Sequence, residues 1–334
     1  MNKFCNFSNN ISSFYSKKIT INLSPPSGFR QRCEFGYYKN SYLMHENDNK
    51  KYLKSFNKAV KSIQILMPEL LNIINNNFEI KEKLFQINFR SNNNDDVMVT
   101  LVYHKTINED LIKIIKELSK DLKINILLRS KNFLYSTNSN YLTNFIDNKI
   151  KIYQTDNCFF QPNKFMLPKM ISKVISLINK QKDLLELYCG VGTFTLPLSK
   201  VFTKILATEN NRISIKCLNK ALIENNINNI SYSRLSSSEV SHLFEGKKFR
   251  RMGDIKITDY DFSHVIVDPP RSGLDFNTLN ILKKFKNIIY ISCNPKTYIN
   301  DIKRLTSHYI DDIELFDQFP NSDHLEIISL LRVK

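Results

Sequence analysis

The chain has 334 residues, of which 42% are hydrophobic and 24% are charged. This length fits about two domains, and the composition excludes a collagen, a coiled coil and a disulfide-rich scaffold. No apolar run reaches the roughly 20 residues that a membrane-spanning helix needs, and the start MNKFCNFSNN has no apolar stretch of signal-peptide length. We therefore expect a globular cytoplasmic protein without a membrane partner.

The charge balance is strongly basic, with 48 Lys and Arg against 32 Asp and Glu and a net charge of +16. Such an excess favours a polyanionic partner, nucleic acid first. A nucleotide bias of the source genome explains the crowding of Lys, Asn and Ile equally well, so charge alone does not decide whether the chain binds nucleic acid.

The cysteines are Cys5, Cys33, Cys158, Cys189, Cys217 and Cys293. They form no CxxC pair and lie at no zinc-ligand spacing from a His, so we expect no metal site.

The first half of the chain, residues 1–155, mixes strands and helices. Strands are predicted over residues 35–38, 84–89, 97–104 and 124–128, and helices over 55–77 and 108–122. Pro68 can kink or interrupt the first helix, and Asn108 is placed to cap the second. The order strand, helix, strand, strand, helix, strand predicts a split α/β layer of ferredoxin type.

The second half, residues 156–334, is more regular. A helix over 163–181 is expected to join the halves, and short apolar runs at 184–188, 204–209, 230–234, 264–268 and 288–292 read as strands. Four of them precede helical patterns, whereas the third leads into a short helix over 237–244. Strands alternating with helices predict a mostly parallel, doubly wound sheet. Residues 245–261 read as an exposed loop. The stretches 313–319 and 325–333 predict a terminal hairpin with an antiparallel strand at the edge, as in common S-adenosylmethionine methyltransferases.

The segment LLELYCGVGTF runs from a predicted strand into Gly190 and Gly192. Such a loop lets the backbone approach a ligand closely, and Glu209, nineteen residues after Gly190, is placed to bind ribose hydroxyls. NAD fits this spacing equally well. However, Thr195 replaces the third glycine of the dinucleotide pattern and no pyrophosphate clamp is evident, which favours adenosine without phosphates. A tight structural turn is the alternative.

Two further strand ends carry chemistry. The segment VDPPRSGLD places Asp268 at the cleft, and Arg271 stands where amino-group methyltransferases carry a stacking aromatic residue, which argues against that chemistry. Cys293 ends the next strand on the same sheet edge. A lone cysteine is more often a buried apolar residue, but its place beside a cofactor loop makes it a candidate nucleophile. Glu326, usually a solvated strand-edge residue in such a position, gains a role if Cys293 needs a nearby proton acceptor.

These motifs, together with FRQRCEFGYY, KLFQINF, LVYHK, NCFFQPN and FDQFP…HLE, resemble those of the S-adenosylmethionine-dependent RNA 5-methyluridine methyltransferases over nearly the whole chain. The members most similar act on the T-loop uridine of tRNA. The resemblance implies a C-terminal Rossmann-like methyltransferase domain, residues 156–334, and an N-terminal α+β RNA-recognition domain, residues 1–155. It also implies S-adenosyl-L-methionine as cofactor, the T arm of tRNA as partner and tmRNA as an open second substrate.

The resemblance also implies residue roles. Cys293 is the nucleophile that attacks carbon 6 of uridine, which makes carbon 5 nucleophilic, and Glu326 accepts the carbon 5 proton after methyl transfer. The implied cofactor-binding residues are Gln161, Tyr188, Thr193, Glu209 and Asp268. Arg271 is expected at the polar edge of the uracil. Phe85 matches a position that stacks in the opened T loop, although core packing explains an aromatic residue there at least as well.

The chain departs from the family pattern at Thr193, where the family often has Asn, and at Ile327-Ile328, which replace a Cys-Gly pair. Neither change removes a catalytic group, so we expect an active enzyme. Two alternatives stay open: a 23S ribosomal RNA methyltransferase and a non-catalytic protein that binds or folds tRNA. Relatives acting on 23S RNA often carry a cluster-binding Cys set or an extra barrel. Cys5 and Cys33 cannot supply four ligands, which favours tRNA.

Overall fold

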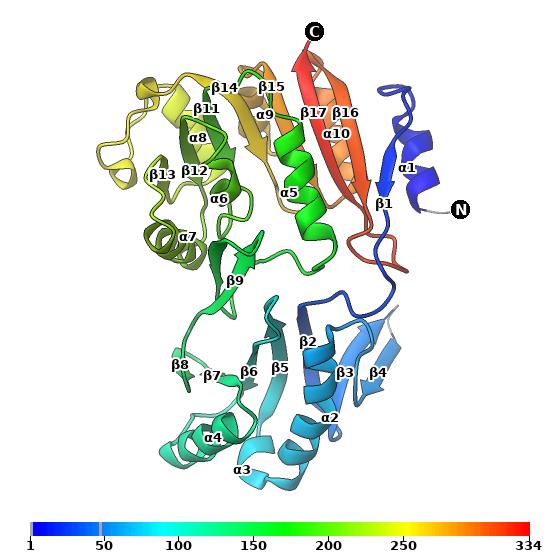
Figure 1. The fold of residues 1–334 in the computed structure, drawn as a ribbon, viewed down its shortest axis with the longest axis vertical. Helices are drawn as coiled ribbons and strands as arrows, with labels where there is room; N and C mark the ends of the chain where they lie inside the picture. The colour runs from blue at the N-terminus through cyan, green and yellow to red at the C-terminus, as the bar shows by residue number, and fades with distance from the viewer. Residues whose placement is uncertain (1–2, 47–48) are drawn as a thin grey trace.

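The computed structural model describes residues 3–46 and 49–334 and has two lobes, joined by extended segments (Figure 1). The lower lobe of that view holds a seven-stranded sheet and the upper lobe an eight-stranded sheet. Both drawn ends of the chain lie in the upper lobe. No helix of the described ranges is long and apolar enough to cross a membrane.

The seven-stranded sheet has the order β4-β3-β2-β5-β6-β7-β8. Its strands are β2 (Arg32–Tyr38), β3 (Ser41–Glu46), β4 (Asn49–Leu53), β5 (Leu84–Ser91), β6 (Val97–Tyr103), β7 (Asn125–Ser130) and β8 (Phe133–Ser136). Its helices are α2 (Lys61–Asn76), α3 (Phe78–Lys81) and α4 (Glu109–Asp121). All neighbours pair antiparallel except β6 and β7, which α4 connects as a parallel crossover unit.

The predicted ferredoxin-type topology is wrong, although each predicted strand and helix of this half is present. The first helix begins at Lys61, later than the predicted residue 55. In a split layer the first and third core strands would lie side by side. Here β2 pairs with β5 and β5 with β6, so the core strands follow one another in chain order. The hairpin β3–β4, which the sequence analysis missed, extends the sheet beyond β2. The two-residue turn that joins β2 to β3 uses Lys39 and Asn40 at positive φ.

Local hydrogen bonds explain the roles of Pro68 in α2 and Asn108 before α4. Pro68 lies inside α2 without ending it. A proline lacks the N–H that would bond four residues back, and the Ser55 hydroxyl donates to that carbonyl, Gln64 O, at 3.3 Å. Asn108 caps α4 as predicted, because its side chain accepts a hydrogen bond from Leu111 N at 3.0 Å.

The eight-stranded sheet has the order β1-β16-β17-β15-β14-β11-β12-β13. Its strands are β1 (Thr20–Asn22), β11 (Asp183–Leu187), β12 (Lys204–Thr208), β13 (Ile230–Ser233), β14 (Phe262–Val267), β15 (Asn287–Ser292), β16 (His308–Phe316) and β17 (Glu326–Val333). The α/β prediction is confirmed, with β17 antiparallel to both neighbours. The expected position of the antiparallel strand is wrong: β17 lies between β15 and β16, and β1 occupies the edge, parallel to β16.

Helices cover both faces of this sheet. They are α1 (Lys3–Ile11), α5 (Met166–Ser176), α6 (Thr195–Leu198), α7 (Arg212–Glu224), α8 (Ser237–Phe244), α9 (Phe276–Leu282) and α10 (Pro295–Arg304). One core contains α5, α6 and α7 together with the hairpin of β9 (Leu142–Ile146) and β10 (Ile150–Gln154). The other contains α1 and α8 to α10. The polar segment 245–261 has two short 3-10 turns, Arg250–Met252 and Ile257–Asp259, and buries Met252.

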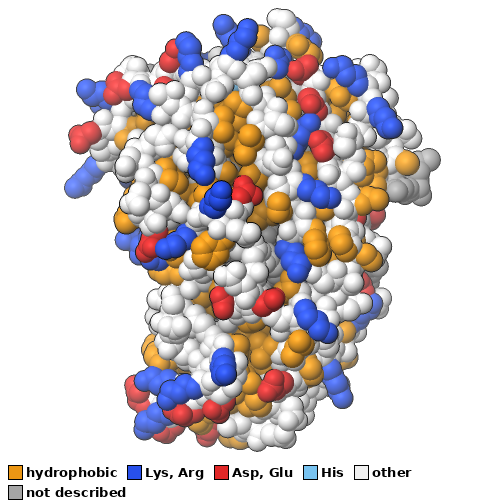
Figure 2. Space-filling view, in the orientation of Figure 1, with side chains coloured by type: hydrophobic (Ala, Val, Ile, Leu, Met, Phe, Trp, Pro, Cys, Tyr) orange, Lys and Arg blue, Asp and Glu red, His pale blue; other side chains and the backbone are white. Residues whose placement is uncertain are grey.

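The first residues of the chain therefore pack with the last ones. The predicted division at residue 155 groups residues 1–155 together, whereas Phe4, Phe7 and Ile11 of α1 are buried in the core of the C-terminal sheet. On the face shown in Figure 2, lysine and arginine side chains are spread over both lobes and are interspersed with acidic ones. On this face the basic excess is thus not gathered into one patch.

Candidate active site

The carboxyl ends of β11, β12, β14 and β15 lie at one edge of the sheet, where open α/β sheets bind ligands. After β11 the backbone takes positive φ at Tyr188 (+61°), Gly190 (+56°) and Gly192 (+93°). A Cβ on Gly192 would lie 2.6 Å from Leu218 Cδ1, so this glycine lets α7 pack closely. A Cβ on Gly190 would meet open space. Gly190 therefore leaves bare backbone that a ligand can approach closely.

Glu209 lies directly beside this glycine loop. Its carboxylate accepts hydrogen bonds from Gly190 N at 3.1 Å and from Asn211 N at 2.7 Å. The side chain is half-buried, and each carboxylate oxygen keeps a lone pair for a further donor. The spacing seen in the sequence thus corresponds to a carboxylate fixed beside the glycine loop, where ribose hydroxyls can donate to it.

Among the buried side chains of the upper lobe, some oxygen atoms lack a protein partner. Glu186, at the end of β11, is 2% exposed and its Oε2 has no hydrogen-bond partner. Burial raises the pKa of its carboxyl to about 8. Gln161 is also buried, and its Oε1 accepts a hydrogen bond from Gln318 Nε2, whose own Oε1 has no partner. Open space at Gly190 and unpaired buried acceptors fit a polar, cationic nucleoside such as S-adenosylmethionine.

Thr193 and Tyr188, two further predicted cofactor residues, are less accessible to a ligand. Thr193 is 8% exposed, beneath the glycine loop. The Tyr188 ring packs against the core that contains α8 to α10, and its hydroxyl lies 3.4 Å from Thr278 Oγ1. The structure therefore gives both residues a clear packing role, and their contact with the cofactor stays a prediction.

Three titratable groups meet where β14, β15 and β17 end or begin. Burial raises the pKa of Asp268 to about 7, with a smaller contribution from the negative charge of Glu209. Burial and Asp268 raise the pKa of Glu326 well above its ordinary value. Glu326 is 4% exposed, so it is not the solvated edge residue that its position at a strand start suggests. Like charges in a low-dielectric site favour protonation of one carboxyl of the pair.

Cys293 follows β15 and faces this acidic pair. Burial, Glu326 and Asp268 raise the pKa of its thiol to about 11, while the positive charge of Arg271 lowers it. The same guanidinium lowers the pKa of Glu326. Arg271 thus favours the ionised form of both Cys293 and Glu326. The electrostatic coupling brings four predicted residues, Asp268, Arg271, Cys293 and Glu326, into one site.

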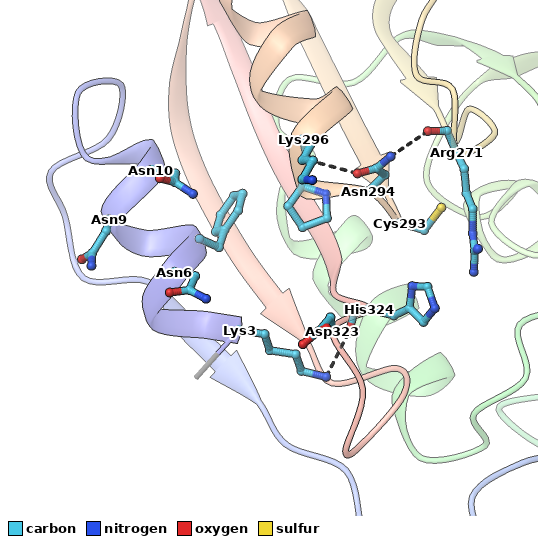
Figure 3. A pocket seen from close by; sticks show the side chains of 12 residues that line it. Lys3, Asn6, Asn9, Asn10, Arg271, Cys293, Asn294, Lys296, Asp323 and His324 are labelled. Carbon is cyan, nitrogen blue, oxygen red and sulfur yellow. Dashed lines mark hydrogen bonds between the residues drawn. The ribbon is translucent and has the colours of Figure 1, made fainter. Parts of the chain in front are cut away.

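A cavity of about 670 Å³ opens beside Cys293 (Figure 3). Arg271, Asn294 and His324 line it together with residues of α1, and Cys293 lies at its inner wall in this view. The Asn294 side chain donates to Arg271 O at 2.9 Å and so joins the Cys293 loop to the Pro-Pro loop. The volume is within the range of small-molecule sites and exceeds what a buried water needs.

The segment 317–325 precedes Glu326 and is held by two residues, Lys3 and Asn163. Lys3 Nζ donates to Asp317 Oδ1 at 2.6 Å, to Phe319 O at 3.0 Å and to His324 O at 2.9 Å. The buried Asn163 side chain donates to Gln318 O at 3.1 Å. An ammonium group has three donors, and all three of Lys3 are used on this one segment.

Phe85 lies apart from this cavity, on β5 of the N-terminal sheet. Its ring is 49% exposed and stacks on His104 at 4.2 Å between centroids with an interplanar angle of 17°. The alternative that Phe85 packs in the core is therefore wrong. An exposed stacked pair offers an aromatic platform to a base.

The sequence analysis missed several residues of these surfaces. His104 follows β6 in the LVYHK motif, and only the register between β5 and β6 reveals its contact with Phe85. Phe159, two residues before Gln161, is 59% exposed, and the FF pair in NCFFQPN was an available signal. Lys3 carried no signal, because its partners lie more than 300 residues away in the sequence.

The strand order, with a late antiparallel strand inserted next to β15 and a glycine loop after β11, defines an S-adenosylmethionine-dependent methyltransferase of the Rossmann-like class. The fold is that of the Pyrococcus abyssi tRNA (uracil-54, C5)-methyltransferase solved in complex with S-adenosyl-L-homocysteine. The TM-score is 0.77 at 21% identity, covering 98% of this chain and 82% of that one.

Residues 1–334 match the family described as tRNA (Uracil-5-)-methyltransferase, and the chain belongs to this family. It is 43% identical over 335 residues to a tRNA/tmRNA (uracil-C(5))-methyltransferase of Campylobacter lari, with 97% of this chain and 96% of that protein covered. The corresponding protein of Saccharophagus degradans is 36% identical over 337 residues, with coverage of 97% and 92%. The chain is accordingly a methyltransferase for uracil carbon 5 of tRNA that uses S-adenosyl-L-methionine.

Proposed function

We propose that this enzyme methylates the T-loop uridine of tRNA, position 54, through a covalent bond between Cys293 and carbon 6 of the base. The observation that carries the proposal is the coupling of Cys293, Glu326 and Asp268 beside a cavity large enough for an extruded base. A uridine inside a folded loop must leave the stack to reach such a cavity.

The chemistry assigns one task to each side chain. The sulfur of Cys293, as a thiolate, bonds to carbon 6 and moves electron density to carbon 5. S-adenosyl-L-methionine supplies the methyl group from its sulfonium. Glu326, as a carboxylate, takes the proton from carbon 5, after which the electrons of that C–H bond reform the double bond and the sulfur leaves. The product is 5-methyluridine, and Cys293 is regenerated.

The electrostatics support these tasks. A carboxylate with a raised pKa is a strong proton acceptor once ionised, and burial gives Glu326 that property. Arg271 favours ionisation of both Cys293 and Glu326. Its guanidinium therefore supports both the attack of the thiolate on carbon 6 and the removal of the carbon 5 proton. Its exposed position beside the cavity also suits a contact with the polar edge of the uracil.

The cofactor groove and the RNA surface complete the proposal. Glu209 accepts a hydrogen bond from Gly190 N and its charge acts on Asp268, which supports cofactor contacts for both residues. We also assign cofactor contacts to Gln161, Tyr188 and Thr193. The T arm of tRNA is the proposed partner of the N-terminal domain, with the exposed Phe85–His104 pair as a stacking platform. Because relatives are named tRNA/tmRNA methyltransferases, we include tmRNA as a substrate. The cytoplasm remains the predicted location.

The test combines product mapping with two variants. Unmodified tRNA is incubated with the enzyme and labelled S-adenosylmethionine, and the modified nucleotide is located by mass spectrometry. We expect 5-methyluridine at position 54, no product with Cys293→Ala, and a covalent RNA–protein adduct with Glu326→Gln, because proton removal precedes release. Cys5→Ala, at an exposed thiol outside the site, is the matched control. Full methylation by Cys293→Ala contradicts the nucleophile assignment, and product only in 23S RNA contradicts the substrate assignment.

A further inference from the structure

The cavity beside Cys293 extends beyond the catalytic groups to the first helix of the chain. Asn6, Asn9 and Asn10 of α1 line one wall, and Lys296 at the start of α10 lies across from them (Figure 3). Asp323 and His324 also line the cavity, and Asp323 lies near Lys3 in this view. None of the four residues Asn6, Asn9, Asn10 and Lys296 is among those the sequence analysis singled out.

The position of α1 is fixed independently of any ligand. Phe4, Phe7 and Ile11 are buried in the core, and the Phe7 ring lies 6.0 Å from that of Tyr298 on α10. Lys3 ties the start of the helix to the segment that precedes Glu326. The polar face of α1 is therefore held rigidly at the cavity mouth, so contacts made there require little ordering of the protein.

The side chains on this face have donors that the fold does not use. Asn6 and Asn10 are exposed, are one helical turn apart and extend toward the cavity in Figure 3. Within the described residues neither side chain makes a hydrogen bond, and Lys296 has no acidic partner there. Two amides and an ammonium group on facing walls match the non-bridging oxygens of a phosphodiester.

The reaction requires phosphodiesters at this place. A uridine whose carbon 6 touches Cys293 stays joined to both neighbouring nucleotides, so its two flanking phosphates must pass out of the cavity. The carboxylate of Asp323 repels phosphate on one side, whereas Lys296 and Arg271 attract it. A phosphate is therefore placed more favourably at the wall that carries Asn6, Asn10 and Lys296 than beside Asp323.

We propose that α1 is part of the RNA-binding surface, with Asn6 and Asn10, together with Lys296, holding a phosphate that flanks the extruded uridine. This inference rests on the proposed function, because it takes the base at Cys293 as its starting point. It adds a second RNA contact, carried by the catalytic lobe and separate from the Phe85–His104 platform of the N-terminal sheet.

The experiment measures RNA affinity and its salt dependence with the full chain and an unmodified T-arm stem-loop. For Asn6→Ala with Asn10→Ala we expect KM for the RNA to rise about tenfold, with kcat and S-adenosylmethionine binding unchanged. For Lys296→Met we expect the slope of log K against log salt to fall by about one, as for one lost phosphate contact. Cys5→Ala with Ser8→Ala on α1 and Lys303→Met at the other end of α10 are the matched controls.

A direct contact is tested by crosslinking. The Glu326→Gln adduct is formed with stem-loops that carry 4-thiouridine on either side of the target, irradiated and digested. We expect a crosslink to a peptide from α1 for one of the two positions. If both variants behave like their controls and every crosslink maps to the N-terminal sheet, the inference is overturned. If the wild-type enzyme forms no 5-methyluridine, the proposed function itself has failed, which is a separate result.

Discussion

The thiol of Cys293 provides a sharp electrostatic prediction. With a pKa of about 11, only about one thiol in ten thousand is ionised at pH 7. A thiol with the ordinary pKa of about 8.5 would have roughly 300 times more thiolate at that pH. Arg271 lowers the pKa of the thiol and Glu326 raises it. Arg271→Met should therefore make the thiol less reactive at neutral pH, and Glu326→Gln should make it more reactive.

Alkylation with iodoacetamide in the absence of RNA measures this directly. A Cys5→Ala background removes the exposed thiol, while Cys33, Cys158, Cys189 and Cys217 are buried. The alkylation rate at Cys293 should rise about tenfold per pH unit from pH 7 to pH 10, because only the thiolate reacts. If the alkylation rate levels off near pH 8.5, the raised pKa of Cys293 is refuted. If Arg271→Met and Glu326→Gln change the rate in the same direction, the assigned effects of the two charges are refuted.

Three further predictions concern stability. Lys3→Met leaves the Asp317 carboxylate and the His324 carbonyl without a donor and removes one of the two donors of the Phe319 carbonyl, so urea unfolding should show a loss of about 1–3 kcal/mol that Lys3→Arg partly restores. Gly192→Ala places a Cβ 2.6 Å from Leu218 Cδ1 at a φ of +93°, and should lower the unfolding free energy by about 1–3 kcal/mol or more; a stability equal to wild type would contradict the packing argument. Glu186, with a folded-state pKa of about 8, holds its proton more tightly when folded, so wild-type stability falls as pH rises from about 5 to 8. Glu186→Gln should therefore raise Tm at pH 8.5 and leave it unchanged at pH 5, and an equal effect at both values would contradict the burial argument.

The C-terminal fold was largely predictable because its signals are local. Each parallel strand is a short apolar run, and a helical pattern follows after a short loop, so chain order specifies the architecture. The position of β17 was not predictable in this way, since nothing within Glu326–Val333 distinguishes an edge strand from one inserted between two others. The N-terminal topology failed for the same reason: element order is local, but which strands pair is decided by packing across the sheet.

The candidate site shows the same division. Gly190, Glu209, Asp268 and Cys293 follow four strands whose carboxyl ends share one edge, so their proximity could be inferred from sequence. The burial of Glu326 could not, because it depends on the insertion of β17 beside β15. Nor could the three hydrogen bonds of Lys3, because they join the two ends of the chain.

The insertion of β17 has a consequence for synthesis on the ribosome. Every other strand of the eight-stranded sheet is translated before it, so until it emerges β15 and β16 have no shared partner and present open edges. The glycine loop and the thiol of Cys293 are therefore synthesised before Glu326, the proposed proton acceptor. Premature termination within the final strand should therefore yield a chain that is both catalytically idle and prone to self-association, a natural target for proteolytic quality control.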